Sequence, residues 1–449
     1  MLPERFTERM KNMLGDEYPA FEEALGEENV RAVRVNTTKI SIDDFLNKTE
    51  LKLSPISYAA DGFIPESSEH IGKSAEHHAG MFYVQDPGAM ATVKALEIQE
   101  GWRVLDACSA PGGKASQLAS AIGEGGLLLA NEYVPKRAKI IVSNFERLGI
   151  KNAVVVSLDT AKIGEMFRGY FDLVLCDAPC SGEGMFRKYG EAIEEWSEDN
   201  VRLCADRQRE ILGNLSGTVK PGGYLLYSTC TYSKEENEDT VADFLENHPE
   251  FSLCEVNEKM RAATADGLDT MKEARRFYPH ITKGEGQFIA LLKKDEKSDV
   301  LSTILYKESV KMPTKEELSV VKKFFSDNLN AEIHGRIIKW GECLALIGHD
   351  LPIPPYSVFM PGVMLGEVKK GNFFPHHQFF SAYGLLFKRR EELSRGDGRA
   401  EKYLRGEEID STLSENGWCA VTYEGVALGG GKISGGRVKN HYPKGLRNN

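Results

Sequence analysis

The sequence predicts an α/β protein with a doubly wound, mostly parallel sheet at its centre. Three observations support this prediction. Short apolar runs alternate with helical patterns between residues 102 and 292, which is typical of a parallel sheet covered by helices. A glycine-rich turn, Pro111-Gly112-Gly113, follows the first apolar run. Cys180 and Cys230 come just after two later runs, where the side chains of parallel strands face a ligand crevice.

The elements of this region follow one another in a regular order. The expected strands are 102–107, 126–132, 153–159, 171–177, 224–229 and 286–292, and the expected helices are 114–122, 135–148 and 201–219. Strand 171–177 is nearly all apolar, as expected of a strand covered on both faces. After Cys230, Ser233-Lys234-Glu235-Glu236 has the form of a capping box and predicts a helix toward Leu245.

Composition limits the classes of protein that the chain can belong to. With 449 residues, 41% of them hydrophobic and 27% charged, the chain is expected to fold into about three domains. No apolar run approaches the roughly 18 residues that span a bilayer, and the charged start lacks the apolar core of a signal peptide. We therefore expect a cytoplasmic protein without a membrane segment.

The cysteines are scattered and suit neither disulfides nor zinc. Eight cysteines occur, with no Cys-x-x-Cys pair and no histidine at zinc-ligand spacing, so no metal is expected. A lone cysteine is more often buried and inert than reactive. A net charge of −11 also counts against a nucleic-acid ligand unless basic residues gather locally.

The turn after the first strand predicts a nucleotide-like ligand. It consists of Cys108, Ser109, Ala110, Pro111, Gly112, Gly113 and Lys114. Glycines let the backbone approach a ligand, and a helix N-terminus offers free amide donors. The turn is not a phosphate-binding Walker A loop, because Cys108 stands where that loop has glycine and Ala115 follows Lys114.

Two acids at later strand ends narrow the choice of ligand. Glu132 is placed to accept hydrogen bonds from two ribose hydroxyls, and Asp159 to reach an adenine amino group. Each acid alone could equally be a helix cap. A glycine-rich turn with acids at two strand ends fits S-adenosylmethionine better than a phosphate-rich cofactor.

Three segments occur in one order along the chain: Ala110–Lys114, Asp177-Ala178-Pro179-Cys180-Ser181-Gly182 and Ser228-Thr229-Cys230-Thr231. In this they resemble the RNA cytosine-C5 methyltransferases of the Sun (Nol/Nop/Sun) family. Arg31–Thr37 is similar to the family's N-terminal RNA-contacting region, and Phe82–Met90 to its lead-in to the catalytic domain. Gly435–Arg447 resembles the PUA-like terminal domain of the bacterial RsmF-type branch, which modifies 16S ribosomal RNA. Ser109 and Ala115 depart from the family, which often has Ala and Thr there.

The resemblance implies a Rossmann-like, S-adenosylmethionine-dependent core with a small N-terminal α+β domain and C-terminal α+β and PUA-like RNA-binding domains. The expected ranges are 1–75 for the N-terminal RNA-binding region, 76–295 for the catalytic domain, 303–380 for an intermediate domain and 381–449 for the PUA-like domain. The charged stretch 293–297 is the clearest boundary in the sequence itself.

The resemblance also implies a division of labour between the two cysteines. Cytosine C5 is too electron-poor to attack a sulfonium methyl group, so a nucleophile must first add at C6. Cys230 is then the nucleophile and Cys180 assists product release, while Asp177 lies beside the methionine end of the cofactor and hydrogen-bonds the N3 and N4 edge of the base. The site should lower the Cys230 pKa, and the helix expected near Ser233 is one source of that effect. The target cytosine must be unstacked.

Basic residues mark where RNA is expected to bind. Residues 431–449 contain Lys432, Arg437, Lys439, Lys444 and Arg447 and no acid. The track could extend over Arg31, Arg34, Lys39, Lys369, Lys370, Lys388, Arg389 and Arg390, with Phe373, Phe374, Phe379 and Phe380 nearby. The expected partner is 16S ribosomal RNA or the small ribosomal subunit, and the chain is expected to be a monomer.

Two kinds of alternative remain open at this stage. One is a methyltransferase that acts on tRNA or on DNA cytosine, although DNA enzymes use the cysteine of a Pro-Cys motif and do not need a Thr-Cys partner such as Cys230. The other is an RNA-binding ribosome-assembly factor with a vestigial core. Which cytosine is modified, and whether the substrate is naked RNA or an assembled subunit, is open.

Overall fold

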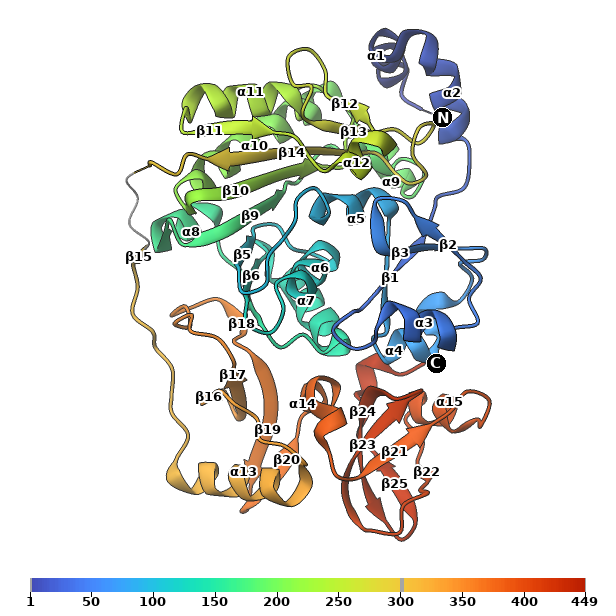
Figure 1. The fold of residues 1–449 in the computed structure, drawn as a ribbon, viewed down its shortest axis with the longest axis vertical. Coiled ribbons are helices and arrows are strands. Elements are labelled where there is room, and N and C mark those ends of the chain that lie inside the picture. The colour runs from blue at the N-terminus through green and yellow to red at the C-terminus, as the bar shows by residue number, and fades with distance from the viewer. Residues whose placement is uncertain (1, 299–302, 449) are drawn as a thin grey trace.

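The computed structural model describes residues 2–298 and 303–448 (Figure 1). Its central sheet has ten strands in the order β12-β13-β14-β10-β9-β5-β6-β7-β18, with β11 also paired to β14. The parallel strands are β10 (Val219–Thr229), β9 (Phe171–Asp177), β5 (Arg103–Asp106), β6 (Leu127–Asn131) and β7 (Ala153–Val156). The antiparallel strands are β11 (Phe251–Cys254), β12 (Ala265–Asp266), β13 (Arg275–Phe277), β14 (Gln287–Lys294) and β18 (Val358–Met360). The fold class predicted from the sequence is confirmed.

Helices cover both faces of this sheet. They are α5 (Pro87–Val93), α6 (Gly113–Ala121), α7 (Pro135–Leu148), α8 (Thr160–Met166), α10 (Glu198–Ser216), α11 (Glu238–Asn247) and α12 (Glu258–Ala263), whereas α9 (Gly190–Glu195) packs with the N-terminal helices. Alternate residues of β9 point to opposite faces: Leu173 packs with α5, α6 and α7, whereas Val174 packs with α8, α10 and α11. Both faces are therefore apolar, which explains the continuous hydrophobic runs in the sequence.

The N-terminal residues form a separate sheet and a helical pair. Its elements are α1 (Glu4–Leu14), α2 (Tyr18–Leu25), β1 (Ala32–Val35), α3 (Ile42–Lys48), β2 (Leu53–Ile56), β3 (Ala59–Pro65), α4 (Ala75–His78) and β4 (Phe82–Gln85), with the sheet order β2-β3-β1-β4. Phe6 and Phe21 of the helical pair pack against Phe186, Trp196 and Tyr232 of the catalytic region. The two helices thus support the back of the loops that follow β9 and β10.

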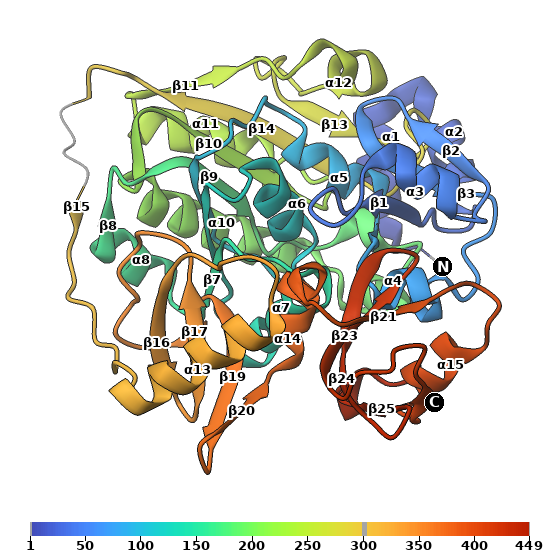
Figure 2. The same ribbon diagram turned by 60° about the horizontal axis from the view of Figure 1, so that its bottom comes forward.

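Two further sheets follow the catalytic region. Short β15 (Thr303–Ile304) pairs with β8 (Phe167–Arg168), and the next elements are α13 (Lys315–Asn328), β16 (Arg336–Trp340), β17 (Cys343–Ile347), β19 (Val363–Lys369), β20 (Asn372–Pro375) and α14 (His377–Tyr383). The last sheet, of order β21-β23-β24-β25-β22, contains β21 (Arg390–Leu393), β22 (Ile409–Asp410), β23 (Gly417–Tyr423), β24 (Val426–Ser434) and β25 (Arg437–Asn440), with α15 (Arg399–Leu404) beside it. In both ribbon views α14 lies between α7 and this C-terminal sheet (Figures 1 and 2).

Two details of the expected elements are wrong. Ser233–Glu236 is not a capping box, because α11 begins only at Glu238 and its N-cap residue, Asn237, makes no side-chain capping bond. The acid of that pattern, Glu236, instead accepts hydrogen bonds from Ser181 and Gln208, so partners distant in sequence replace the local one. Helix α10 ends at Ser216, and β10 already begins at Val219, which pairs with Phe171 across an irregular register.

Two basic residues expected on the RNA track face the protein interior instead: Arg34 is buried and Lys39 is half-buried. Arg34 is 3% exposed, and the Lys39 ammonium contacts carbonyl oxygens of Ala79 at 2.9 Å and Ala427 at 2.9 Å. Lys39 therefore joins the N-terminal region to β24. Three of the four expected aromatics, Phe373, Phe379 and Phe380, belong to the core under α13 and α14, whereas Phe374 is 46% exposed.

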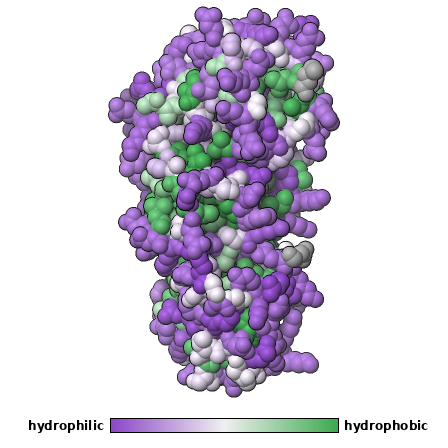
Figure 3. Space-filling model, turned by 90° about the vertical axis from the view of Figure 1, so that its right-hand side faces the viewer, coloured by the Kyte–Doolittle hydropathy of each residue, from purple (hydrophilic) through white to green (hydrophobic). Residues whose placement is uncertain are grey.

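Hydrophilic side chains cover most of the face seen in Figure 3, where apolar side chains gather in separate patches. Within residues 2–298 and 303–448, no helix combines the length and apolar character that a membrane crossing requires.

Candidate active site

A cavity of about 890 Å³ opens at the carboxyl edge of the parallel strands. It lies where β5 is flanked by β6 on one side and β9 on the other, the switch point at which doubly wound sheets bind ligands. The sequence-predicted residues that line it are Cys108, Ser109, Ala110, Pro111, Gly113, Lys114, Glu132, Asp159, Asp177, Cys180 and Cys230. The remaining predicted residue, Gly112, is the N-cap of α6.

The turn before α6 depends on its glycines and on a buried arginine. Gly112 has a φ of 106°, a conformation that glycine adopts without strain. A Cβ on Gly113 would lie 3.1 Å from the ring of Tyr83. Arg34 donates to the Gly113 carbonyl at 2.7 Å and to Ser116 Oγ at 2.7 Å. Burial lowers the Arg34 pKa to about 10, so the guanidinium stays charged at neutral pH and fixes the start of α6.

The two acids at the strand ends are held differently. Glu132 accepts a hydrogen bond from the Val134 amide at 3.0 Å and pairs with Arg137 at 3.2 Å, with 4% of its side chain exposed. Asp159 accepts from the Ala161 amide at 2.8 Å and caps α8. Asp159 therefore serves as the helix cap that the sequence left as an alternative, and it still lines the cavity.

The set of groups around the cavity fits the nucleoside part of S-adenosylmethionine. A carboxylate at a strand end is a suitable acceptor for ribose hydroxyls, and Glu132 is a cavity-lining carboxylate of this kind. The start of α6 adds backbone amides of a helix N-terminus. Tyr83, Gln85 and Asp86 also line the cavity; sequence reasoning missed them as lining residues, although they lie in the segment 82–90 that it singled out.

The two thiols meet at one wall of the cavity. Cys180 Sγ and Cys230 Sγ are 2.9 Å apart, and the Cys230 amide donates to Cys180 Sγ at 3.3 Å. Each cysteine follows one of two adjacent parallel strands, in which Ser228 pairs with Asp177. The hydrogen bond with Cys230, together with burial and the Cys230 charge, raises the Cys180 pKa well above its usual range.

A lysine and two carboxylates lie beside the thiols. Lys114 Nζ is 2.9 Å from Asp177 Oδ2, and Ser228 Oγ donates to Asp177 Oδ1 at 2.7 Å. Burial opposes the charge on Lys114, but Asp177, with Cys230 and Asp106 adding to it, raises the Lys114 pKa. Burial and the neighbouring Asp177 raise the Asp106 pKa to about 7. Lys114 therefore supplies a positive charge that interacts with Cys230, whereas the helix expected near Ser233 begins only at Glu238.

Two buried glutamates tie the cysteine loops together, and sequence reasoning missed their role. Glu236 Oε2 accepts from the Ser181 amide at 2.9 Å and from Gln208 at 2.8 Å, while Ser181 Oγ donates to Glu236 Oε1. Ser181 Oγ also lies 3.0 Å from Thr231 Oγ1, which donates to Glu183 at 2.9 Å. For Glu236 the signal was an acid shortly after the Thr-Cys motif, but the capping-box pattern Ser233–Glu236 assigned it to a helix cap.

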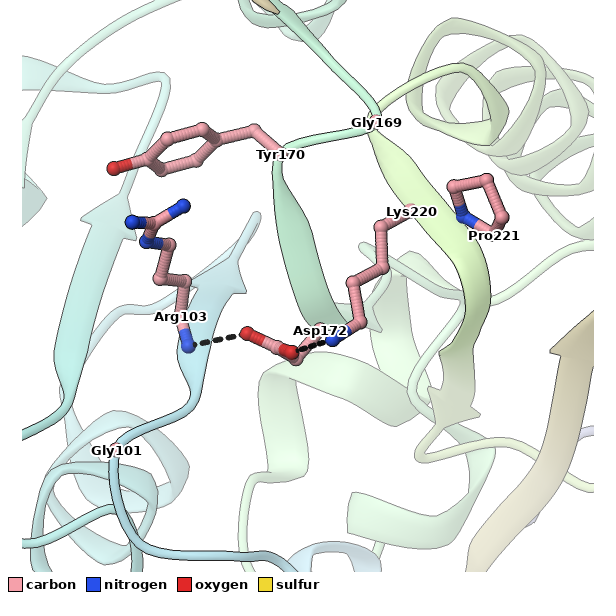
Figure 4. A pocket seen from close by; sticks show the side chains of 7 residues that line it. All are labelled: Gly101, Arg103, Gly169, Tyr170, Asp172, Lys220 and Pro221. Atoms are coloured by element: carbon pink, nitrogen blue, oxygen red, sulfur yellow. Dashed lines mark hydrogen bonds and ion pairs between the residues drawn. The ribbon is translucent and has the colours of Figure 1, made fainter. Parts of the chain in front are cut away.

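A second hollow, at the amino edge of the same sheet, is less suited to chemistry. It is lined by Gly101, Arg103, Gly169, Tyr170, Asp172, Lys220 and Pro221 (Figure 4). Asp172 accepts bonds from both Lys220 and the Arg103 amide, and the Arg103 guanidinium lies 4.7 Å from the Tyr170 ring centroid. Its charges thus satisfy one another.

Three family models match successive parts of the chain. The model described as 16S rRNA methyltransferase RsmB/F matches residues 93–293, that of the N-terminal domain of 16S rRNA methyltransferase RsmF matches 2–87, and that of the methyltransferase RsmF PUA domain matches 390–448.

Full-length relatives agree with these matches. The chain is 31% identical to ribosomal RNA small subunit methyltransferase F of Vibrio vulnificus (strain YJ016), over 99% of this chain and 97% of the relative. It is 32% identical to the protein of the same name from Klebsiella pneumoniae (strain 342), over 93% and 90%.

A solved structure resembles part of the fold. The methyltransferase homolog protein from Pyrococcus horikoshii is 30% identical, has a TM-score of 0.58, and aligns over 65% of this chain and 95% of its own. From these relatives and the cavity at the switch point, we conclude that the chain belongs to the RsmB/F family of 16S rRNA methyltransferases, whose methyl donor is S-adenosylmethionine.

Proposed function

We propose that this protein methylates C5 of a cytosine in 16S ribosomal RNA through a covalent adduct with Cys230. The observation that carries the proposal is the pair of thiols, Cys180 and Cys230, with sulfur atoms 2.9 Å apart on the wall of the cofactor cavity. The relatives named small subunit methyltransferase F support ribosomal RNA as the substrate.

For the cofactor we propose the residues predicted from the sequence. The turn from Cys108 to Lys114, with Glu132, Asp159 and Asp177, would hold S-adenosylmethionine, and Glu132 would accept hydrogen bonds from the ribose hydroxyls. When bound, the cofactor supplies an electrophilic methyl group to C5 of the activated base.

The protein activates the base by nucleophilic addition. The Cys230 thiolate attacks C6 and forms a C6–S bond, while the electrons of the C5–C6 double bond move toward C5. Asp177, which Lys114 and Ser228 hold in place, accepts a hydrogen bond from the exocyclic N4 group and orients the ring. The base must leave its stack to reach this site.

Release of the product uses the second thiol. Once Cys230 sulfur is bound to C6 it carries no charge, so its charge no longer raises the Cys180 pKa, while burial and Glu236 still do. Cys180 gives up its proton to solvent at this stage. The Cys180 thiolate then takes the C5 proton. The C5–H electrons re-form the C5–C6 double bond, and the C6–S bond breaks to return the Cys230 thiolate.

The test is methyl transfer from labelled S-adenosylmethionine to small ribosomal subunits, naked 16S RNA, tRNA and duplex DNA, with the product mapped as 5-methylcytosine. We expect label in 16S RNA, either naked or in subunits. Label in DNA or tRNA alone, or label at another atom of the base, would contradict the proposal. No transfer to any of the four would favour an RNA-binding role.

A further inference from the structure

Three side chains form a row across the C-terminal sheet. Trp418 of β23 pairs with Lys432 of β24, and Lys432 pairs with Lys439 of β25. Paired residues of adjacent strands point to the same face. The neighbouring residues Ile433 and Val438 point to the opposite face and are buried in the core. The face that carries Trp418, Lys432 and Lys439 is therefore opposite to that core. Helix α14 covers this outer face at Ala420 and Gly430 and leaves the end with Trp418, Lys432 and Lys439 open.

Aromatic rings extend this row on the side of β20. The exposed Phe374 lies edge-on to Trp418, with ring centroids 6.4 Å apart and planes at 84°. His441, also exposed, lies 4.7 Å from Trp418 at 65°. Phe380 packs beneath Trp418 at 6.3 Å and is itself buried. Phe380 thus fixes Trp418 from below, while Phe374 and His441 leave ring surface in water. We name Phe374, Trp418, Lys432, Lys439 and His441 the aromatic–basic strip.

The lysines of the strip carry charge that nothing nearby neutralises. Lys432 Nζ lies 5.8 Å from the Trp418 ring centroid. Neither Lys432 nor Lys439 forms an ion pair within the described part of the chain, and both are exposed. The acids at the border of the strip are already paired, Glu415 with Arg389 and Glu408 with Arg437. The strip therefore combines open ring surface with free positive charge in a protein of net charge −11.

We infer that the aromatic–basic strip binds an unpaired segment of the RNA substrate, with bases stacked on its rings and phosphates beside its lysines. This inference rests on the proposed function, because it concerns how that RNA is held. Aromatic rings with interleaved lysines bind single strands of any sequence, since every base offers a π face. A double helix keeps those faces stacked inside, so the chemistry favours an unpaired segment.

A short structural path joins the strip to the cavity. Beside the strip, α14 packs on α7, and His376 at the start of α14 lies 3.5 Å from Glu146 near the end of α7. At its other end α7 follows Val134, and Val134 and Arg137 line the cavity. A helix of this length spans about 21 Å. One RNA molecule can therefore contact both places while the target base occupies the cavity.

The test measures the Kd of a fluorescein-labelled 12-nucleotide oligouridine for the protein by fluorescence anisotropy. This probe stacks but offers no cytosine to the cavity. We expect Trp418→Ala and Phe374→Ala each to raise the Kd about 10-fold. The double variant Lys432→Met/Lys439→Met should make the negative slope of log K against log salt shallower by about 1.4. Lys402→Met, an exposed lysine on α15 of the same region, is the control and should bind like the wild type.

Several outcomes would overturn the inference. Unchanged Kd values in the strip variants, or an equal loss in Lys402→Met, would show that the strip is not a specific RNA surface. A change of oligomeric state in the variants, with oligouridine affinity unchanged, would assign the strip to contact between copies of this chain. If Trp418→Ala does not fold, Trp418→Phe, which retains an aromatic ring, is measured in its place. If wild-type protein transfers no methyl group to 16S RNA, the proposed function fails whatever the strip binds; if it transfers normally and the strip variants bind normally, only the strip inference fails.

Discussion

The carboxyl edge of the central sheet and the outer face of the C-terminal sheet use polar side chains in opposite ways. At the carboxyl edge, Asp177, Glu236 and Arg34 are each held by partners within 3 Å. On the outer face, Lys432 and Lys439 are exposed and form no ion pair among the described residues. Buried polar groups must be satisfied within the protein, whereas exposed ones remain available to a ligand. Changes in the first region should therefore alter chemistry or folding, and changes in the second only affinity.

The largest effect is expected at the thiols. Cys230→Ala removes the nucleophile and should lower the rate of methyl transfer by about 10³-fold or more. Cys180→Ala leaves addition possible but removes the base for release, so it should accumulate protein linked to RNA. Denaturing gel electrophoresis of each variant with 16S RNA and S-adenosylmethionine distinguishes them. A linked species with Cys230→Ala in place of Cys180→Ala would mean that the two roles are reversed.

The next effect separates a buried arginine from an exposed one in the same segment. Arg34→Met removes a charged donor from the Gly113 carbonyl and from the Ser116 hydroxyl and should reduce the free energy of unfolding by about 3 kcal/mol. It should also weaken S-adenosylmethionine binding, because the start of α6 loses its support. Denaturant unfolding and calorimetry measure the two effects. Arg31→Met, at an exposed position, is the control; an equal loss there would contradict the distinction.

A smaller effect tests the glutamate that joins the cysteine loops. Burial raises the Glu236 pKa to about 7. Protonated Oε1 donates to Ser181 Oγ, which then donates to Thr231 and completes a chain of hydrogen bonds to Glu183. A carboxyl with a raised pKa in the folded state adds stability below its unfolded pKa and loses it as pH rises through the folded value. The wild type should lose about 2 kcal/mol of stability through this group between pH 5.5 and 8.

Substitutions at neighbouring glutamates separate this effect from general pH dependence. Glu236→Gln mimics the protonated carboxyl, so its unfolding free energy should lack that part of the pH dependence while kcat is largely kept. Glu236→Ala breaks the connection between the loops and should lower kcat by roughly 10-fold. Glu235→Gln serves as control, because hydrogen bonds with Arg9 and Ser233 overcome the effect of burial and lower the Glu235 pKa to about 2. Equal pH profiles for Glu236→Gln and the wild type would refute the role of Glu236.

The sequence predicted the positions that local pattern determines. The core strands, α7 and the placement of Cys180 and Cys230 at strand ends follow from apolar periodicity and from the geometry of parallel sheets. Arg34 could not be placed in this way, because whether an arginine in a strand meets solvent or the start of a distant helix depends on tertiary packing. The same holds for Glu236, whose acceptor role depends on Ser181, a residue 55 positions away.

The smallest effect is expected on the outer face, where it is most informative. Lys432→Met removes an exposed charge with no ion pair in the described residues, so the free energy of unfolding should change by no more than about 0.5 kcal/mol. The same variant should raise KM for 16S RNA and leave kcat unchanged, since no group that contacts the reacting base has moved. Steady-state kinetics beside thermal unfolding measures both. A fall in kcat, or a loss of stability comparable to that of Arg34→Met, would mean that Lys432 also serves the fold or the reaction, and that the two regions do not differ as proposed.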